Sequence, residues 1–84
     1  MEDFVYYFEN GNEVRVYEGE DGYTVSFKDE NLMGTFTDIE NLLYGIGQLC
    51  QNNFKDMSEG AGFAMRLSDL MGIDYDTCFE LLMK

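Results

Sequence analysis

The sequence predicts an α+β fold: one domain in which an antiparallel β-meander of three to four strands is followed by about three α-helices. Its 84 residues are 45 % hydrophobic and contain no proline, which is enough apolar material for one small core. Apolar and polar residues alternate through residues 1–36, as they do in half-buried strands. Beyond residue 37 the apolar residues recur at helical spacing, so we expect the helical part at 37–84.

Strands are expected at residues 3–8, 13–18 and 23–28, with a short fourth strand at 32–36 after a turn at 29–31. Asn-Gly at 10–11 and Asp-Gly at 21–22 are typical of two-residue hairpin turns. Those turns place a set of apolar residues on one face of the sheet: Val5, Tyr7, Val14, Val16, Val25 and Phe27. The opposite face is then partly aromatic, with Phe4, Tyr6, Phe8 and Tyr17, and we expect helices, a second subunit or a partner to cover it.

Three helices are expected in the second half of the chain. Thr37 and Glu40 have the spacing of a capping box, and the glycines at 45 and 47 favour close packing of this first helix against the sheet. Ser58 is expected to cap the second helix, which ends at Gly72. Asp74 is expected to cap the third.

Composition argues against catalysis. The chain has no histidine, so Ser-His and Cys-His dyads are excluded, and neither cysteine has an activating neighbour. Cys50 and Cys78 are expected to be buried small hydrophobic residues. Two distant cysteines do not make a zinc site, and Asp74-x-Asp76 lacks the later ligands of a calcium loop. We therefore expect a protein that is not an enzyme and has no metal or cofactor.

The net charge of −12, from 17 acidic and 5 basic residues, is the most informative feature of the composition. Such a surface repels nucleic acid and anionic lipid and attracts basic partners. The N-terminus has no signal-peptide pattern and no apolar run is long enough to span a membrane, so a cytoplasmic location with reduced thiols is expected.

The segment Arg66–Leu82 resembles the two-helix core of a helix-turn-helix, with Gly72 at the turn. In that family the second helix enters the major groove of DNA, but here its exposed positions are acidic and would face phosphates. The same segment is similar to the first two helices of ubiquitin-associated domains, through Met71-Gly72-Ile73, although the third helix of that family is missing. A helical hairpin that closes the core is the simpler interpretation.

Several acidic residues lie in strands or turns, where carboxylates are uncommon, and we interpret them as a phosphate-like lattice. The chain resembles the small acidic phage-encoded inhibitors, of the anti-CRISPR and DNA-mimic type, in size, acidity and sheet-plus-helix composition. No motif is shared, so no functional residue carries over from them. The predicted contact residues for a basic nucleic-acid-binding partner are Glu18, Glu20, Asp21, Asp29 and Glu30 in a hairpin patch, Asp74, Asp76 and Glu80 in a second patch, and Tyr17, Tyr23 and Tyr75, which could stack on arginine.

Two other interpretations stay open at this stage. The acidic residues could serve only for solubility or to protect sheet edges. Alternatively, the protein is a small structural or adaptor protein that forms a homodimer through the aromatic face of the sheet.

Overall fold

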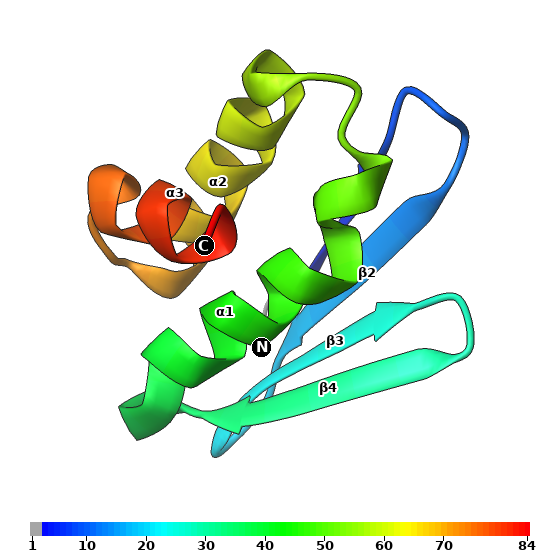
Figure 1. Cartoon of the computed structure of the whole chain (residues 1–84). Helices are drawn as coiled ribbons and strands as arrows, with labels where there is room; N and C mark the ends of the chain where they lie inside the picture. The colour runs from blue at the N-terminus through cyan, green and yellow to red at the C-terminus, as the bar shows by residue number, and fades with distance from the viewer. Residues whose placement is uncertain (1–2) are drawn as a thin grey trace.

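The computed structural model describes residues 3–84 and confirms the α+β prediction, with a four-stranded antiparallel sheet followed by three α-helices in one domain. The strands lie in chain order: β1 (Asp3–Tyr7), β2 (Glu13–Glu18), β3 (Gly22–Phe27) and β4 (Glu30–Thr35). The helical part follows: η1 (Phe36–Asp38), α1 (Ile39–Cys50), η2 (Gln51–Asn53), α2 (Met57–Met71) and α3 (Tyr75–Leu82). Figure 1 shows the three α-helices gathered on one side of the sheet. Residues 1 and 2 of the predicted meander lie outside the described part.

The predicted register of the first hairpin is wrong by one residue. Phe4 pairs with Val16, and Tyr6 with Val14, where Val5 and Tyr7 were expected. The reason is the turn, which has three residues: the Phe8 N–H donates to Asn12 O at 2.8 Å, and Gly11 takes a φ of +96°. That geometry is typical of a type I turn followed by a bulge at glycine. A slip of one residue turns every side chain of β1 to the other face, so Phe4, Tyr6 and Phe8 face the core.

The second hairpin differs from its prediction by two residues, which keeps the faces unchanged. Val16 pairs with Val25, and the turn residues are Glu20 and Asp21 in place of Asp21 and Gly22. Gly22 begins β3, where a Cβ would collide with the carbonyl oxygen of Gly34 on β4. Glycine is thus required there by the close approach of two strands rather than by a turn.

The third turn is shorter than expected. It consists of Lys28 and Asp29, and Lys28 adopts a φ of +54°. Strand β4 therefore begins at Glu30, two residues earlier than predicted.

The core lies between the sheet and the helices and is centred on Phe63 of α2, which is fully buried. Its ring contacts those of Phe4, Tyr6, Phe8 and Phe54, with centroids 4.9 to 6.4 Å apart. Edge-on and tilted aromatic pairs at such distances add about 0.5–1.5 kcal/mol each beyond the area that they bury. The aromatic residues of β1 thus hold α2 against the sheet.

The helix ends agree with the prediction in part. Asp74 caps α3 by accepting the Thr77 N–H at 3.1 Å, and Gly72 ends α2 with a φ of +67°, both as expected. The capping box at Thr37 does not form, because η1 precedes α1 and no side chain caps that helix. Ser58 is not a cap either, since Asp56 takes that place by accepting the Glu59 N–H at 3.0 Å.

The two glycines of α1 permit two different contacts. A Cβ at Gly45 would lie 3.4 Å from Leu32 Cδ1, so the predicted close packing against the sheet is confirmed at this residue. A Cβ at Gly47 would collide with the carbonyl oxygen of Leu82, so this glycine instead admits the end of α3. The helical layer is therefore closed by α3, which packs against both α1 and α2.

Candidate functional site

The fold brings the β2–β3 turn and the start of the helical part to the same end of the molecule. The Phe36 N–H of η1 donates to Asp21 O at 3.1 Å, and the Phe36 ring meets the Tyr23 ring edge-on with centroids 5.3 Å apart. These contacts place Asp38, the last residue of η1, near the turn residues Glu20 and Asp21. We call these three residues, Glu20, Asp21 and Asp38, the acidic end.

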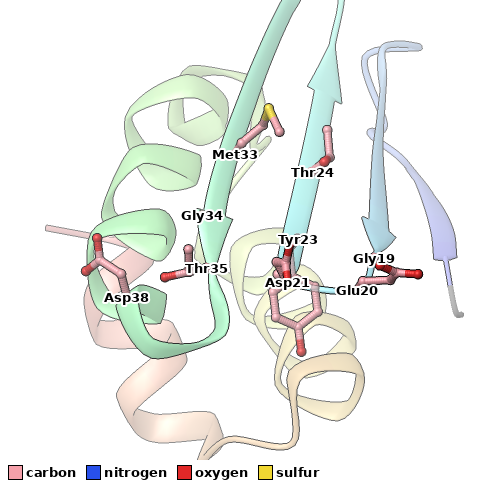
Figure 2. A pocket seen from close by; sticks show the side chains of 10 residues that line it. Gly19, Glu20, Asp21, Tyr23, Thr24, Met33, Gly34, Thr35 and Asp38 are labelled. Carbon is pink, nitrogen blue, oxygen red and sulfur yellow. The ribbon is translucent and has the colours of Figure 1, made fainter.

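The acidic end surrounds a surface hollow of about 450 Å³. Besides the three carboxylates, the hollow is lined by Thr24 and Met33 and by the glycines at the ends of the strands. Figure 2 shows the Asp38 carboxylate on one side of β4, and Glu20 and Asp21 on the other. A hollow with carboxylates at its rim and Met33 in its wall has the chemistry to hold a long cationic side chain.

The electrostatics of the acidic end are uncompensated. Within residues 3–84 the one ion pair joins Lys55 to Glu9, at 3.7 Å, in the region of the β1–β2 turn. Asp38 accepts a hydrogen bond from the Asn41 side chain at 2.9 Å, which is a neutral partner. The three carboxylates at the acidic end therefore keep their full charge toward an approaching cation.

The predicted hairpin patch is divided between the two ends of β3. The half-buried Glu18 and the exposed Glu20 and Asp21 lie near the first residue of β3. Asp29 and Glu30 lie beyond its last residue. A strand of six residues spans roughly 17 Å, so the five residues do not form one continuous surface. Only Asp21 and Glu20 combine with another carboxylate, Asp38, around a hollow.

The predicted tyrosine contacts are only partly accessible. Tyr23 is 4 % exposed and lines the hollow at the acidic end, so it offers a partner little surface. Tyr17 is exposed on the outer face of the sheet, within 6.0 Å of the Arg15 guanidinium. Tyr75 is half-buried and stacks on Phe79.

The second predicted patch lies on the first turns of α3. Asp74, Asp76 and Glu80 are all exposed, so a partner could reach them. Asp74 is also structural, because its carboxylate accepts from the Thr77 N–H and lies 3.3 Å from the Thr77 hydroxyl. We call Asp74, Asp76 and Glu80 the α3 patch.

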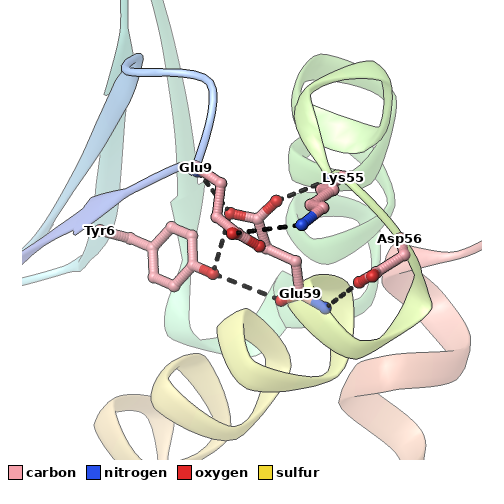
Figure 3. Close-up of polar contacts among 5 residues, drawn as sticks. All are labelled: Tyr6, Glu9, Lys55, Asp56 and Glu59. Atoms are coloured by element: carbon pink, nitrogen blue, oxygen red, sulfur yellow. Dashed lines mark hydrogen bonds and ion pairs between the residues drawn. The ribbon is translucent and has the colours of Figure 1, made fainter.

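Sequence reasoning missed the role of Glu59, which is 7 % exposed. It accepts the backbone N–H groups of Lys55 at 2.6 Å and Glu9 at 2.8 Å, and the Tyr6 hydroxyl lies 3.5 Å away (Figure 3). Burial, followed by the nearby Glu59 charge, raises the pKa of Tyr6. We call this group, Tyr6, Glu9, Lys55 and Glu59, the polar junction. Its one local signal is Asp56-x-x-Glu59, which has capping-box spacing.

The thiols offer no reactive group at the surface. Cys50 and Cys78 are free and buried, as predicted, and burial raises the pKa of each to about 12. Within the described chain, no three Cys, Asp or Glu side chains are grouped to hold a metal ion. No helix of residues 3–84 is long and apolar enough to cross a membrane.

Comparison with known proteins gives no relative: no family model, curated protein or solved structure matches the chain.

Proposed function

We propose that this chain is a non-enzymatic binding protein whose acidic surface occupies the nucleic-acid-binding site of a basic partner. The most specific form of this proposal is a phage anti-CRISPR protein or a similar inhibitor of host defence. The supporting observation is the acidic end, where Glu20, Asp21 and Asp38 surround one hollow without a cationic neighbour in an ion pair.

The physical basis is the substitution of carboxylates for phosphates. Alternate residues on a strand lie roughly 6.5–7 Å apart, and helical neighbours about 5–6 Å apart, which is close to the spacing of charges along a polynucleotide. A groove lined by lysine and arginine would attract such a surface from a distance and would release its own bound anions on contact. Affinity should therefore fall steeply as the salt concentration rises.

The test is capture from a bacterial lysate at low salt on immobilised protein, followed by elution with single-stranded DNA. We expect the captured proteins to be nucleases or other nucleic-acid-binding proteins, and we expect DNA to displace them. A captured set that contains no such protein, or that DNA does not displace, would contradict the proposal.

A matched pair of variants locates the contact. Glu20→Lys with Asp21→Lys reverses two charges at the acidic end, and Asp29→Lys with Glu30→Lys makes the same change at the opposite end of β3. We expect the first pair to reduce capture at least about tenfold and the second to have a much smaller effect. If neither pair reduces capture and Asp76→Lys with Glu80→Lys does, the contact is the α3 patch and the acidic end is not.

The alternative is an adaptor that forms a homodimer through Phe4, Tyr6, Phe8 and Tyr17, but these four side chains do not share one face of the sheet, because only Tyr17 lies on the outer face. Phe8 is buried at 3 % exposure, and the Phe4 and Tyr6 rings pack against the core. Those three side chains belong to the covered face of the sheet.

A further inference from the structure

The outer face of the sheet carries no helix and differs in charge from the rest of the molecule. We call it the open face, and the strand pairing defines its members: Asp3, Val5, Tyr7, Glu13, Arg15, Tyr17, Thr24, Ser26, Asn31 and Met33, with Lys28 at its edge. We propose that a second copy of this chain docks on the open face.

The first argument is the exposure of apolar side chains. Tyr7 is 69 % exposed and Met33 is 80 % exposed, and Tyr17 lies between their strands on the same face. Side chains of this size are the ones enriched at protein interfaces, where they lose contact with water. Strand β1 therefore presents apolar side chains both to the core and to solvent.

The second argument is charge. The open face holds two acidic and two basic residues, so it is neutral, and the remainder of the chain carries the whole net charge of −12. Two copies that approach through their acidic surfaces bring like charges together, which is unfavourable. Two open faces meet with less of that repulsion, and they offer Arg15 and Lys28 to the carboxylates of Asp3 and Glu13 in the other copy. A two-fold symmetric contact needs such a self-complementary surface.

The area of the open face limits the affinity of the dimer. Four strands spaced about 4.8 Å apart and about 17 Å long form a small platform, below the area of a standard stable interface. We therefore expect a weak dimer, with a dissociation constant on the order of 10–100 μM. The open face shares Thr24 and Met33 with the hollow at the acidic end, but it contains none of the carboxylates of the acidic end or the α3 patch, so the two proposals can be tested with separate variants.

The test is sedimentation equilibrium from about 10 μM to 1 mM in low and high salt. Salt screens the repulsion between two chains of charge −12, so self-association should strengthen as salt rises, whereas capture of a basic partner should weaken. A protein that remains monomeric at 1 mM in both salts overturns the proposal.

Two matched variants assign the surface. Tyr7→Lys lies on the open face, and Tyr44→Lys makes the same change at an exposed tyrosine of α1. We expect Tyr7→Lys to weaken the dimer at least about tenfold and Tyr44→Lys to change it less than about twofold. Equal effects of the two variants would also overturn the proposal. So would the finding that a labelled RNA oligonucleotide, and not a second copy, binds the open face. Circular dichroism of each variant establishes that it is folded.

Discussion

The two ends of the sheet use the same residue type in opposite ways. At the β1–β2 turn, the Glu59 carboxylate is buried and accepts two backbone N–H groups, so it joins the turn to α2. At the β2–β3 turn, Glu20 and Asp21 are exposed around a hollow and form no ion pair within residues 3–84. Net charge alone therefore says little about function, because the surroundings of each carboxylate decide whether it stabilises the fold or remains available to a partner.

The largest effect concerns the two thiols, which report whether a variant at either end leaves the shared core intact. Burial raises the pKa of Cys50 and Cys78 from 9 to about 12, so at pH 8 their thiolate fraction should be about 1,000-fold smaller in the folded than in the unfolded protein. Labelling with a thiol reagent should be correspondingly slow until denaturant is added. Because the folded state keeps the thiols protonated, stability should decrease as the pH rises from about 9 to about 12. Rapid labelling of native protein would contradict this.

The polar junction should be the most sensitive carboxylate site. Glu59→Ala leaves the N–H groups of Glu9 and Lys55 without their acceptor, and we expect it to lower the free energy of unfolding by about 2–4 kcal/mol. Glu59→Gln retains one oxygen acceptor and should cost less. Urea denaturation measures both, and a loss below about 1 kcal/mol for the alanine variant would show that the junction is not structural.

Two aspartates in equivalent positions sharpen the comparison. Asp56 caps α2 through the Glu59 N–H, whereas Asp38 precedes α1 and makes no cap bond. We expect Asp56→Ala to cost about 1 kcal/mol and Asp38→Ala less than about 0.5 kcal/mol. Thermal unfolding of the two variants distinguishes them, and equal destabilisation would mean that the hydrogen bond from the Asn41 side chain to Asp38 stabilises the start of α1 as much as a cap does.

The exposed ion pair should matter least. Lys55 and Glu9 lie 3.7 Å apart, and both side chains are more than half exposed. We expect Lys55→Ala to change stability by less than about 0.5 kcal/mol, with the difference vanishing in high salt. Glu59 accepts the Lys55 backbone N–H, which this variant keeps. A loss above 1 kcal/mol would indicate that the ion pair is part of the junction.

Sequence alone predicted the type and order of the elements because those depend on periodicity. The helical spacing of the apolar residues in α1, the end of α2 at Gly72 and the cap of α3 at Asp74 are local patterns. All three agree with the structure. The first turn was not predictable in the same way, since Asn10-Gly11 fits both a two-residue turn and the observed three-residue turn. The sequence therefore predicted Val5 and Tyr7 for the face that Phe4, Tyr6 and Phe8 occupy.

The candidate site was less predictable because it depends on tertiary contacts. Asp38 follows Asp21 by seventeen residues, and the pairing of Thr35 with Gly22, together with the hydrogen bond from Phe36, brings it to the same hollow. Tyr23 lies two residues before Val25 on the same face of β3, so strand alternation accounts for its burial, whereas its edge-on contact with Phe36 is a tertiary feature. Glu59 had a helix-start signal, but the two N–H groups that it accepts come from two loops that are far apart in the sequence and adjoin in the fold.

Strand β1 is apolar on both sides, and this has a consequence for how the chain tolerates length changes. Hydrophobicity therefore does not determine which face of β1 turns to the core. The loop that ends at Gly11 and the hydrogen bond from the Glu9 N–H to Glu59 determine it instead. Deleting Tyr7 would shift the preceding residues of β1 by one position, which turns Val5 toward the core and Phe4 and Tyr6 outward. A one-codon deletion in β1 would thus change which side chains lie on the outer face of the sheet, while the other three strands keep their places.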